Sequence, residues 1–161
     1  MCNYDLQHLT DLLNWPDFKV NIFANWAITG SRYLKSKAGY NIEGNKMEFV
    51  PLYNLKGGLT AQYKRASMAL QAGFTSFQFT DAANEPMDPN DAVYGIYGAI
   101  PGYCVVDLNL DYRLNKYIDL VLSFQNINNS IYMTRRASGY PGPGIIPSAP
   151  FNFMGTVMFH L

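Results

Sequence analysis

Two adjacent arginines and a proline-stiffened loop form the segment of this chain best suited to binding chemistry. Arg135 and Arg136 are followed by Tyr140 within the run Gly-Tyr-Pro-Gly-Pro-Gly at 139–144. A guanidinium group can hold a carboxylate through two parallel hydrogen bonds, and proline lowers the conformational entropy that a loop loses on binding. The pattern favours Arg135, Arg136 and Tyr140 as ligand-binding residues. A solvated or strand-paired arginine pair at the base of a loop is the open alternative.

Two other loop motifs do not meet the requirements of a phosphate site or a calcium site. Pro141 and Pro143 each lack a backbone N–H, and no helix follows them, so the glycine run is not a phosphate cradle. A loop from Thr80 to Asp91 is rich in oxygen ligands but lacks the spacing of a calcium loop. We expect a solvated, mobile loop there; its oxygen-bearing residues are Asp81, Asn84, Glu85, Asp88 and Asp91.

No residue pattern indicates catalysis, metal binding or nucleic-acid binding. His8 and His160 have no partner at motif spacing, and no nucleophile elbow is present. Cys2 and Cys104 do not have metal-ligand spacing, and the basic residues form no contiguous patch. The sequence therefore predicts a protein that is not an enzyme, with no catalytic residue, no metal site, no cofactor and no nucleic-acid partner.

The elements that must position the loops are strands, because apolar residues recur with a period of two. Most of these segments reach the roughly 9–11 residues that a tilted strand needs to cross a bilayer. The last of them carries Phe151, Phe153, Val157 and Phe159 on one face. The segments are Phe18–Thr29, Leu52–Lys64, Ser67–Thr75, Cys104–Leu114, Ile118–Gln125 and Phe151–Leu161, and 1–15 could be the remnant of an earlier strand.

The connections between these strands are alternately short and long. Long connections at 30–51, 80–102 and 127–150 are separated by tight turns at 63–67 and 115–117. Bacterial outer-membrane barrels have this alternation, with short periplasmic turns and long extracellular loops. We predict an all-β antiparallel meander of about six or seven strands, forming part of a larger transmembrane β-barrel. A soluble barrel with its apolar face inside has the same alternation, so that alternative stays open.

Composition and length favour a piece of a larger barrel. The chain has 161 residues, zero formal net charge and a mean hydropathy of -0.10, as expected for a barrel with a polar lumen. Single-chain barrels start near eight strands, and unpaired strand edges are not tolerated in hydrocarbon. The segment 1–9 lacks the basic and apolar regions of a signal peptide. We therefore expect 1–161 to be a C-terminal fragment.

Three stretches resemble the C-terminal third of TonB-dependent outer-membrane receptors, especially those for ferric citrate and siderophores. The first resembles a strand entry after an extracellular loop. The second resembles the family's proline-glycine-tyrosine, aspartate and asparagine-turn run. The third, the most specific, resembles the last extracellular loop. The first stretch is Met47–Pro51 with Leu59–Tyr63. The second is Ile100–Tyr103 with Asp107, Tyr112, Gln125–Asn129 and Tyr132. The third is Thr134–Ile145 with Pro147.

The resemblance implies a function for a larger parent protein. The parent would take up a ferric siderophore or ferric citrate across the outer membrane, driven by TonB acting through a plug domain. This chain shows neither the plug nor the family's energy-coupling box, so the fragment alone should be inactive. Its implied partners are outer-membrane lipid, the missing N-terminal barrel strands, the plug and a ferric chelate. A small passive outer-membrane channel and a soluble β-barrel carrier are the alternatives, and the resemblance does not identify the substrate.

Overall fold

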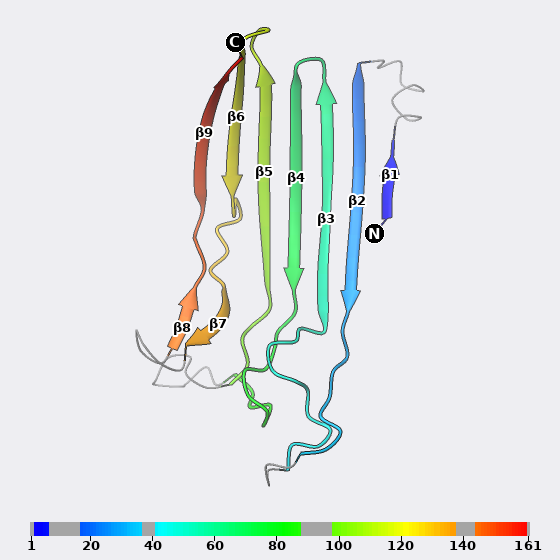
Figure 1. The fold of residues 1–161 in the computed structure, drawn as a ribbon, viewed down its shortest axis with the longest axis vertical. Helices are drawn as coiled ribbons and strands as arrows, with labels where there is room; N and C mark the ends of the chain where they lie inside the picture. Colours follow the sequence, from blue (N-terminus) through cyan, green and yellow to red (C-terminus); the bar gives the residue numbers. More distant parts are fainter. Residues whose placement is uncertain (1, 7–16, 37–40, 88–97, 138–143, 161) are drawn as a thin grey trace.

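The computed structural model describes residues 2–6, 17–36, 41–87, 98–137 and 144–160, which form an antiparallel all-β structure. A seven-stranded sheet has the order β1-β2-β3-β4-β5-β6-β9, and β7 and β8 form a separate hairpin (Figure 1). The strands are β1 (Cys2–Asp5), β2 (Phe18–Ile28), β3 (Tyr53–Tyr63), β4 (Ala66–Thr75), β5 (Tyr103–Arg113), β6 (Ile118–Gln125), β7 (Met133–Ala137), β8 (Gly144–Pro147) and β9 (Asn152–Phe159). No helix in these ranges is long and apolar enough to cross a membrane.

The strand register collects the apolar alternates of the long strands on one face of the sheet. One row across the sheet pairs Ile22 with Leu59, Leu59 with Leu70, and Leu70 with Leu108. A slip of one residue would turn a whole strand's apolar set to the opposite face, so the shared apolar face specifies the register strongly. We call the two faces the apolar face and the polar face. The polar face carries Asn54, Gln62, Asn109 and Gln125.

The apolar face is not covered by any described part of the chain. Trp26 and Ile28 are each 67% exposed and Phe159 is 72% exposed. The buried hydrophobic residues among those described are Ala99 and Ile100, and both lie in a loop rather than in the sheet. An open sheet with an exposed apolar face needs an apolar surrounding, and a soluble carrier would instead turn this face inward.

Short turns and long loops lie at opposite ends of the sheet, as predicted. The turns β3–β4 and β5–β6 lie at the top of Figure 1, which we call the turn end. The described parts of the connections 29–52, 76–102 and 126–151 extend from the bottom, which we call the loop end. The β7–β8 hairpin is part of the third connection. At the sheet edges, β1 and β9 each pair with one neighbour among the described strands.

The predicted strands are confirmed, with small changes at their ends. Thr29, Leu52 and Lys64 lie outside the strands, and the last strand is Asn152–Phe159, while Leu161 lies outside the described residues. The remnant expected within 1–15 includes β1, which pairs with β2 between Cys2 and Ala24. The β7–β8 hairpin was not predicted, because Met-Thr-Arg-Arg-Ala has no alternation to signal a strand.

A turn rich in asparagine completes the edge of β5 beyond the reach of β6. The β6 register begins at Leu108, so β5 extends past its neighbour towards the loop end. Asn128 accepts a hydrogen bond from Val106 N at 3.1 Å and donates one to Cys104 O at 2.9 Å. Ile127 N donates to Val106 O at 2.8 Å. The turn therefore satisfies backbone groups of β5 that a longer β6 would otherwise pair.

Candidate functional site at the loop end

The first and second loops are joined by side chains that bind backbone groups. Asn84 accepts a hydrogen bond from Lys46 N at 2.6 Å and donates to Lys46 O at 2.8 Å. Asn45 donates to Ala82 O at 2.9 Å. Asn84 has a positive φ of 61°, a conformation that asparagine tolerates better than most residues. These contacts connect segments 38 residues apart and hold the two loops together.

Lys46 also places its charge against two aromatic rings of the second loop. Its Nζ lies 5.4 Å from the ring centroid of Phe77 and 5.9 Å from that of Phe79. Both separations are within the range of a cation–π interaction. Phe49 N donates a hydrogen bond to Phe79 O at 2.8 Å, which extends the junction between the loops. Lys46 therefore acts in loop packing.

Within the first loop, Tyr33 donates a short hydrogen bond to the Glu48 carboxylate. This bond raises the pKa of Tyr33 above its ordinary value of 10.0, with smaller contributions from burial and from the Glu48 charge. The bond needs the protonated phenol. Because the folded-state pKa is the higher one, its contribution to loop stability is complete below the ordinary value. It is lost as pH rises through the raised pKa.

We expect Tyr33 to deprotonate at higher pH than a tyrosine of ordinary pKa. The measurement is the difference in phenolate absorbance between the protein and its Tyr33→Phe variant across alkaline pH. Glu48→Gln should lower the pKa of Tyr33, because the carboxylate charge that opposes phenolate formation is gone. Deprotonation of Tyr33 at or below pH 10.0 would contradict the assigned hydrogen bond.

The two predicted arginine ligands have different surroundings in the third loop. Arg135 is exposed on β7, whereas Arg136 is half-buried and reaches back towards the second loop. The Arg136 guanidinium lies 3.4 Å from Ala99 O and 3.5 Å from Thr80 Oγ1. Gln78 Nε2 donates to Thr134 O at 3.4 Å. Arg135 can therefore meet a ligand from solution, while Arg136 contacts the loop assembly. Tyr140, the third predicted ligand, lies outside the described residues.

The acidic loop is tied to its neighbours where it is described. Asp81 Oδ1 accepts a hydrogen bond from Glu85 N at 3.2 Å, and Asn84 is occupied by Lys46. Asp88 and Asp91 lie outside the described residues. Across the described ranges, no three potential metal ligands from His, Cys, Asp and Glu come together. In this loop Asn84 therefore joins the second loop to the first, a role that sequence spacing did not reveal.

A polar hollow between β2 and β3, where the strands meet the first loop, contains a lysine that sequence reasoning missed. It has a volume of about 390 Å³ and is lined by Asn25, Ala27, Thr29, Pro51, Asn54 and Lys56. Lys56 is exposed on the polar face, directly opposite Asn25 of β2. An ammonium group among amide side chains suits anionic and carbonyl oxygens. The missed signal was a lysine on the polar alternation near the loop end of a strand.

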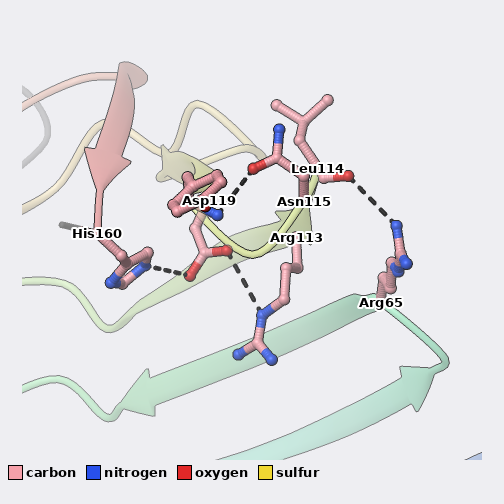
Figure 2. A network of polar contacts seen from close by, with 7 residues as sticks. Arg65, Arg113, Leu114, Asn115, Asp119 and His160 are labelled. Carbon is pink, nitrogen blue, oxygen red and sulfur yellow. Dashed lines mark hydrogen bonds and ion pairs between the residues drawn. The ribbon is translucent and has the colours of Figure 1, made fainter.

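A second polar cluster lies at the turn end, where Figure 2 shows Asp119 between His160 and Arg113. The Asp119 carboxylate is 2.9 Å from His160 Nε2 and 3.5 Å from Arg113 Nε. Arg65 donates to Leu114 O at 3.3 Å and so joins the two short turns. The cluster fixes the end of β9 to β6. His160 has no carboxylate partner at motif spacing in the sequence, but the strand register brings Asp119 next to it.

Comparison with known proteins identifies the architecture. Residues 4–129 match the family described as TonB dependent receptor-like, beta-barrel. The chain belongs to this TonB-dependent receptor β-barrel family. Barrels of this family lie in the outer membrane, and the family is one of receptors and transporters rather than enzymes. No curated protein matches the sequence.

Solved structures of TonB-dependent receptors share the fold of the chain. The ferric citrate transporter FecA, unliganded, has a TM-score of 0.79 and 23% identity; the alignment covers 98% of this chain and 23% of FecA. The siderophore receptor PiuA from Acinetobacter baumannii has a TM-score of 0.65 and 18% identity, with coverage of 89% and 20%. The ferric enterobactin receptor PfeA from Pseudomonas aeruginosa has a TM-score of 0.62 and 16% identity, and the alignment covers 98% of this chain and 21% of PfeA. The chain thus spans about a fifth to a quarter of these receptors.

Proposed function

We propose that residues 1–161 are the C-terminal barrel portion of a TonB-dependent receptor that takes up a ferric siderophore or ferric citrate. The remaining barrel strands and the plug domain belong to other parts of the receptor, and TonB acts through the plug. The fragment alone transports nothing, because an open sheet does not enclose a lumen. Its place is the outer membrane, with the turn end towards the periplasm and the loop end outside.

The observation that carries this proposal is the agreement between the exposed apolar face and the fold. Seven antiparallel strands align their apolar residues on a face that none of the described residues covers, and the same arrangement overlaps the barrel of a ferric citrate transporter over 98% of the chain. A lipid-facing barrel wall explains this exposure. A soluble small-ligand carrier leaves it unexplained.

The loop end supplies groups that suit an anionic ferric chelate. Arg135 is exposed on the third loop, and Lys56 stands on the polar face in the hollow below the first loop. In the proposed sequence of events, the chelate first meets the loops and then the lumen wall. Energised movement of the plug opens the path through the barrel. Joined loops lose less conformational freedom on binding than separate ones, which favours affinity.

The proposal is tested by iron uptake in cells that depend on the complete receptor. Cells with the complete receptor should accumulate radiolabelled iron from ferric citrate or a ferric siderophore, and cells expressing only 1–161 should not. Dissipating the energy source of TonB should abolish the uptake. Uptake that persists without TonB would support a passive channel instead.

Ligand affinity should depend on Arg135 and Lys56 in the folded, complete receptor. Arg135→Gln and Lys56→Gln should each weaken binding of ferric citrate by about tenfold, as expected for loss of one charge-assisted contact. The measurement is equilibrium binding at fixed ionic strength. Arg136→Gln is less informative, because it also removes contacts with Thr80 and Ala99.

Lys19→Gln is the matched control, because Lys19 is an exposed lysine on the polar face near the turn end. It should leave the affinity unchanged. If Arg135→Gln and Lys56→Gln bind ferric citrate as tightly as Lys19→Gln does, the assignment of the loop-end site is wrong.

A further inference from the structure

The apolar face contains a groove at the turn end, and its shape follows from the register. One row pairs Tyr63 with Ala66 and Ala66 with Tyr112, so a small residue stands between two large rings. The next row pairs Ala61 with Met68. The resulting groove has a volume of about 460 Å³, with the two alanines at low points and the two tyrosines as walls. Its size lies within the range of small-molecule sites, roughly 300–1,000 Å³.

The turns beside this groove are strongly basic. The two short turns and the end of β5 carry four basic residues and no carboxylate within 64–65 and 113–117. The basic residues are Lys64, Arg65, Arg113 and Lys116. Asp111, which lines the groove, and Asp119 lie just outside these stretches, so the positive charge belongs to the turns themselves. Arg113 is paired with Asp119 and Arg65 with a backbone carbonyl. Within the described part of the chain, no carboxylate pairs with Lys64 or Lys116.

Both of these lysines lie against tyrosine rings. Lys64 Nζ is 5.1 Å from the ring centroid of Tyr63, which is a wall of the groove, and Lys116 Nζ is 4.6 Å from that of Tyr117. A lysine whose ammonium group lies against an aromatic ring at the edge of an apolar surface is suited to a membrane interface. The arrangement places an ammonium group directly beside the end of an apolar groove.

From this combination we propose a binding site for an anionic phospholipid, phosphatidylglycerol, from the periplasmic leaflet. One acyl chain lies in the groove between Tyr63 and Tyr112, and the phosphate meets Lys64, with Lys116 adding to the positive field. The proposal rests on the outer-membrane placement proposed above. Charge selects an anionic headgroup, because a zwitterionic lipid offers no net charge to the unpaired lysines.

Native mass spectrometry of the whole protein, extracted in mild detergent, tests the site. The probes are phosphatidylglycerol and phosphatidylethanolamine with identical acyl chains. The unaltered protein should retain phosphatidylglycerol preferentially. Lys64→Gln with Lys116→Gln should reduce this binding by about fivefold for each lysine and remove the preference. Lys35→Gln, which changes an exposed lysine of the first loop at the other end of the sheet, should leave the retention of both lipids unchanged. Equal retention of the two lipids by the unaltered protein would overturn the proposal.

The groove is tested separately by filling it. Ala66→Leu should lower retention of both lipids, whereas Ala72→Leu, on the same strand and face but outside the groove, should not. Equal lipid retention by these two variants would overturn the assignment of the acyl chain to the groove. Lys64 and Lys116 are exposed and lie outside the strands, so the lysine comparison decides the headgroup site even if Ala66→Leu alters the sheet. Lipid selectivity and ferric citrate uptake are measured separately, so each proposal can fail alone. Equal lipid retention with intact uptake would overturn only the lipid site, and loss of uptake with intact lipid selectivity would bear only on the receptor function.

Discussion

Asn126→Ala should lower the free energy of unfolding by about 3–4 kcal/mol, because it breaks a buried polar network and strains the backbone. Asn126 is 3% exposed. Its side chain donates to Ser130 O at 2.9 Å and Ala149 O at 3.2 Å and accepts from Ser130 N at 2.8 Å. Each partner left unsatisfied in a buried position costs about 1–3 kcal/mol.

The backbone adds to the effect, because Asn126 has a φ of 53°. Alanine is strained in this conformation and glycine is not. Asn126→Gly should therefore be more stable than Asn126→Ala by about 1 kcal/mol, although both lose the same hydrogen bonds. Asn126→Asp keeps the acceptor but turns a carboxylate oxygen towards Ser130 O and Ala149 O in a buried site, so it should cost at least as much stability as Asn126→Ala.

Denaturant unfolding in lipid vesicles, followed by tryptophan fluorescence, measures these differences. Asn128→Ala provides the comparison, because Asn128 also makes two hydrogen bonds but is exposed. It should cost about 1 kcal/mol, since water can replace its bonds. If Asn126→Ala costs no more than Asn128→Ala, the buried network does not hold the two ends of the third loop together.

The sheet could be predicted from the sequence because one physical requirement acts on every strand. The apolar alternates of β2, β3, β4, β5, β6 and β9 must share a face, and tight turns limit how far each strand can shift. This requirement is enough to place Leu59 beside Leu70. It also makes His160 a diagonal neighbour of Asp119, because Asp119 pairs with Met158. That contact was therefore within reach of sequence reasoning.

The loop end could not be predicted in the same way. Asn84 and Lys46 meet through backbone groups 38 residues apart, and no periodic pattern selects such a pair. The same holds for Arg136, whose contact with Ala99 depends on where two long loops fold. Residue type indicated that Arg135 and Arg136 could bind an anion. It could not indicate that one is exposed while the other contacts its own chain.

Gly58→Ala should destabilise the sheet by about 2–3 kcal/mol, because the space for a Cβ is already occupied. A Cβ on Gly58 would lie 2.8 Å from Leu70 O and would meet the ring of Phe23, with 2.7 Å to its Cζ. Phe23 is the direct partner of Gly58 across β2 and β3, on the polar face. The ring covers the glycine, an arrangement that compensates for the missing side chain.

Gly73→Ala is the matched control, because Gly73 also lies in a strand but has no atom within 4 Å of its Cβ position. It should be neutral or stabilising by up to about 1 kcal/mol, since alanine has less freedom to lose on folding. The same vesicle unfolding experiment compares the two variants. Equal stability of Gly58→Ala and Gly73→Ala would contradict the close packing of Phe23 on Gly58.

The double variant Phe23→Ala with Gly58→Ala separates the two contacts. Removing the ring relieves the clash with Phe23, so the double variant should cost less than the sum of the two single changes. The contact with Leu70 O remains, because it belongs to the backbone of the neighbouring strand. A residual cost of Gly58→Ala in the Phe23→Ala background therefore measures how closely β3 and β4 approach. Strict additivity would mean that the ring does not cover the glycine.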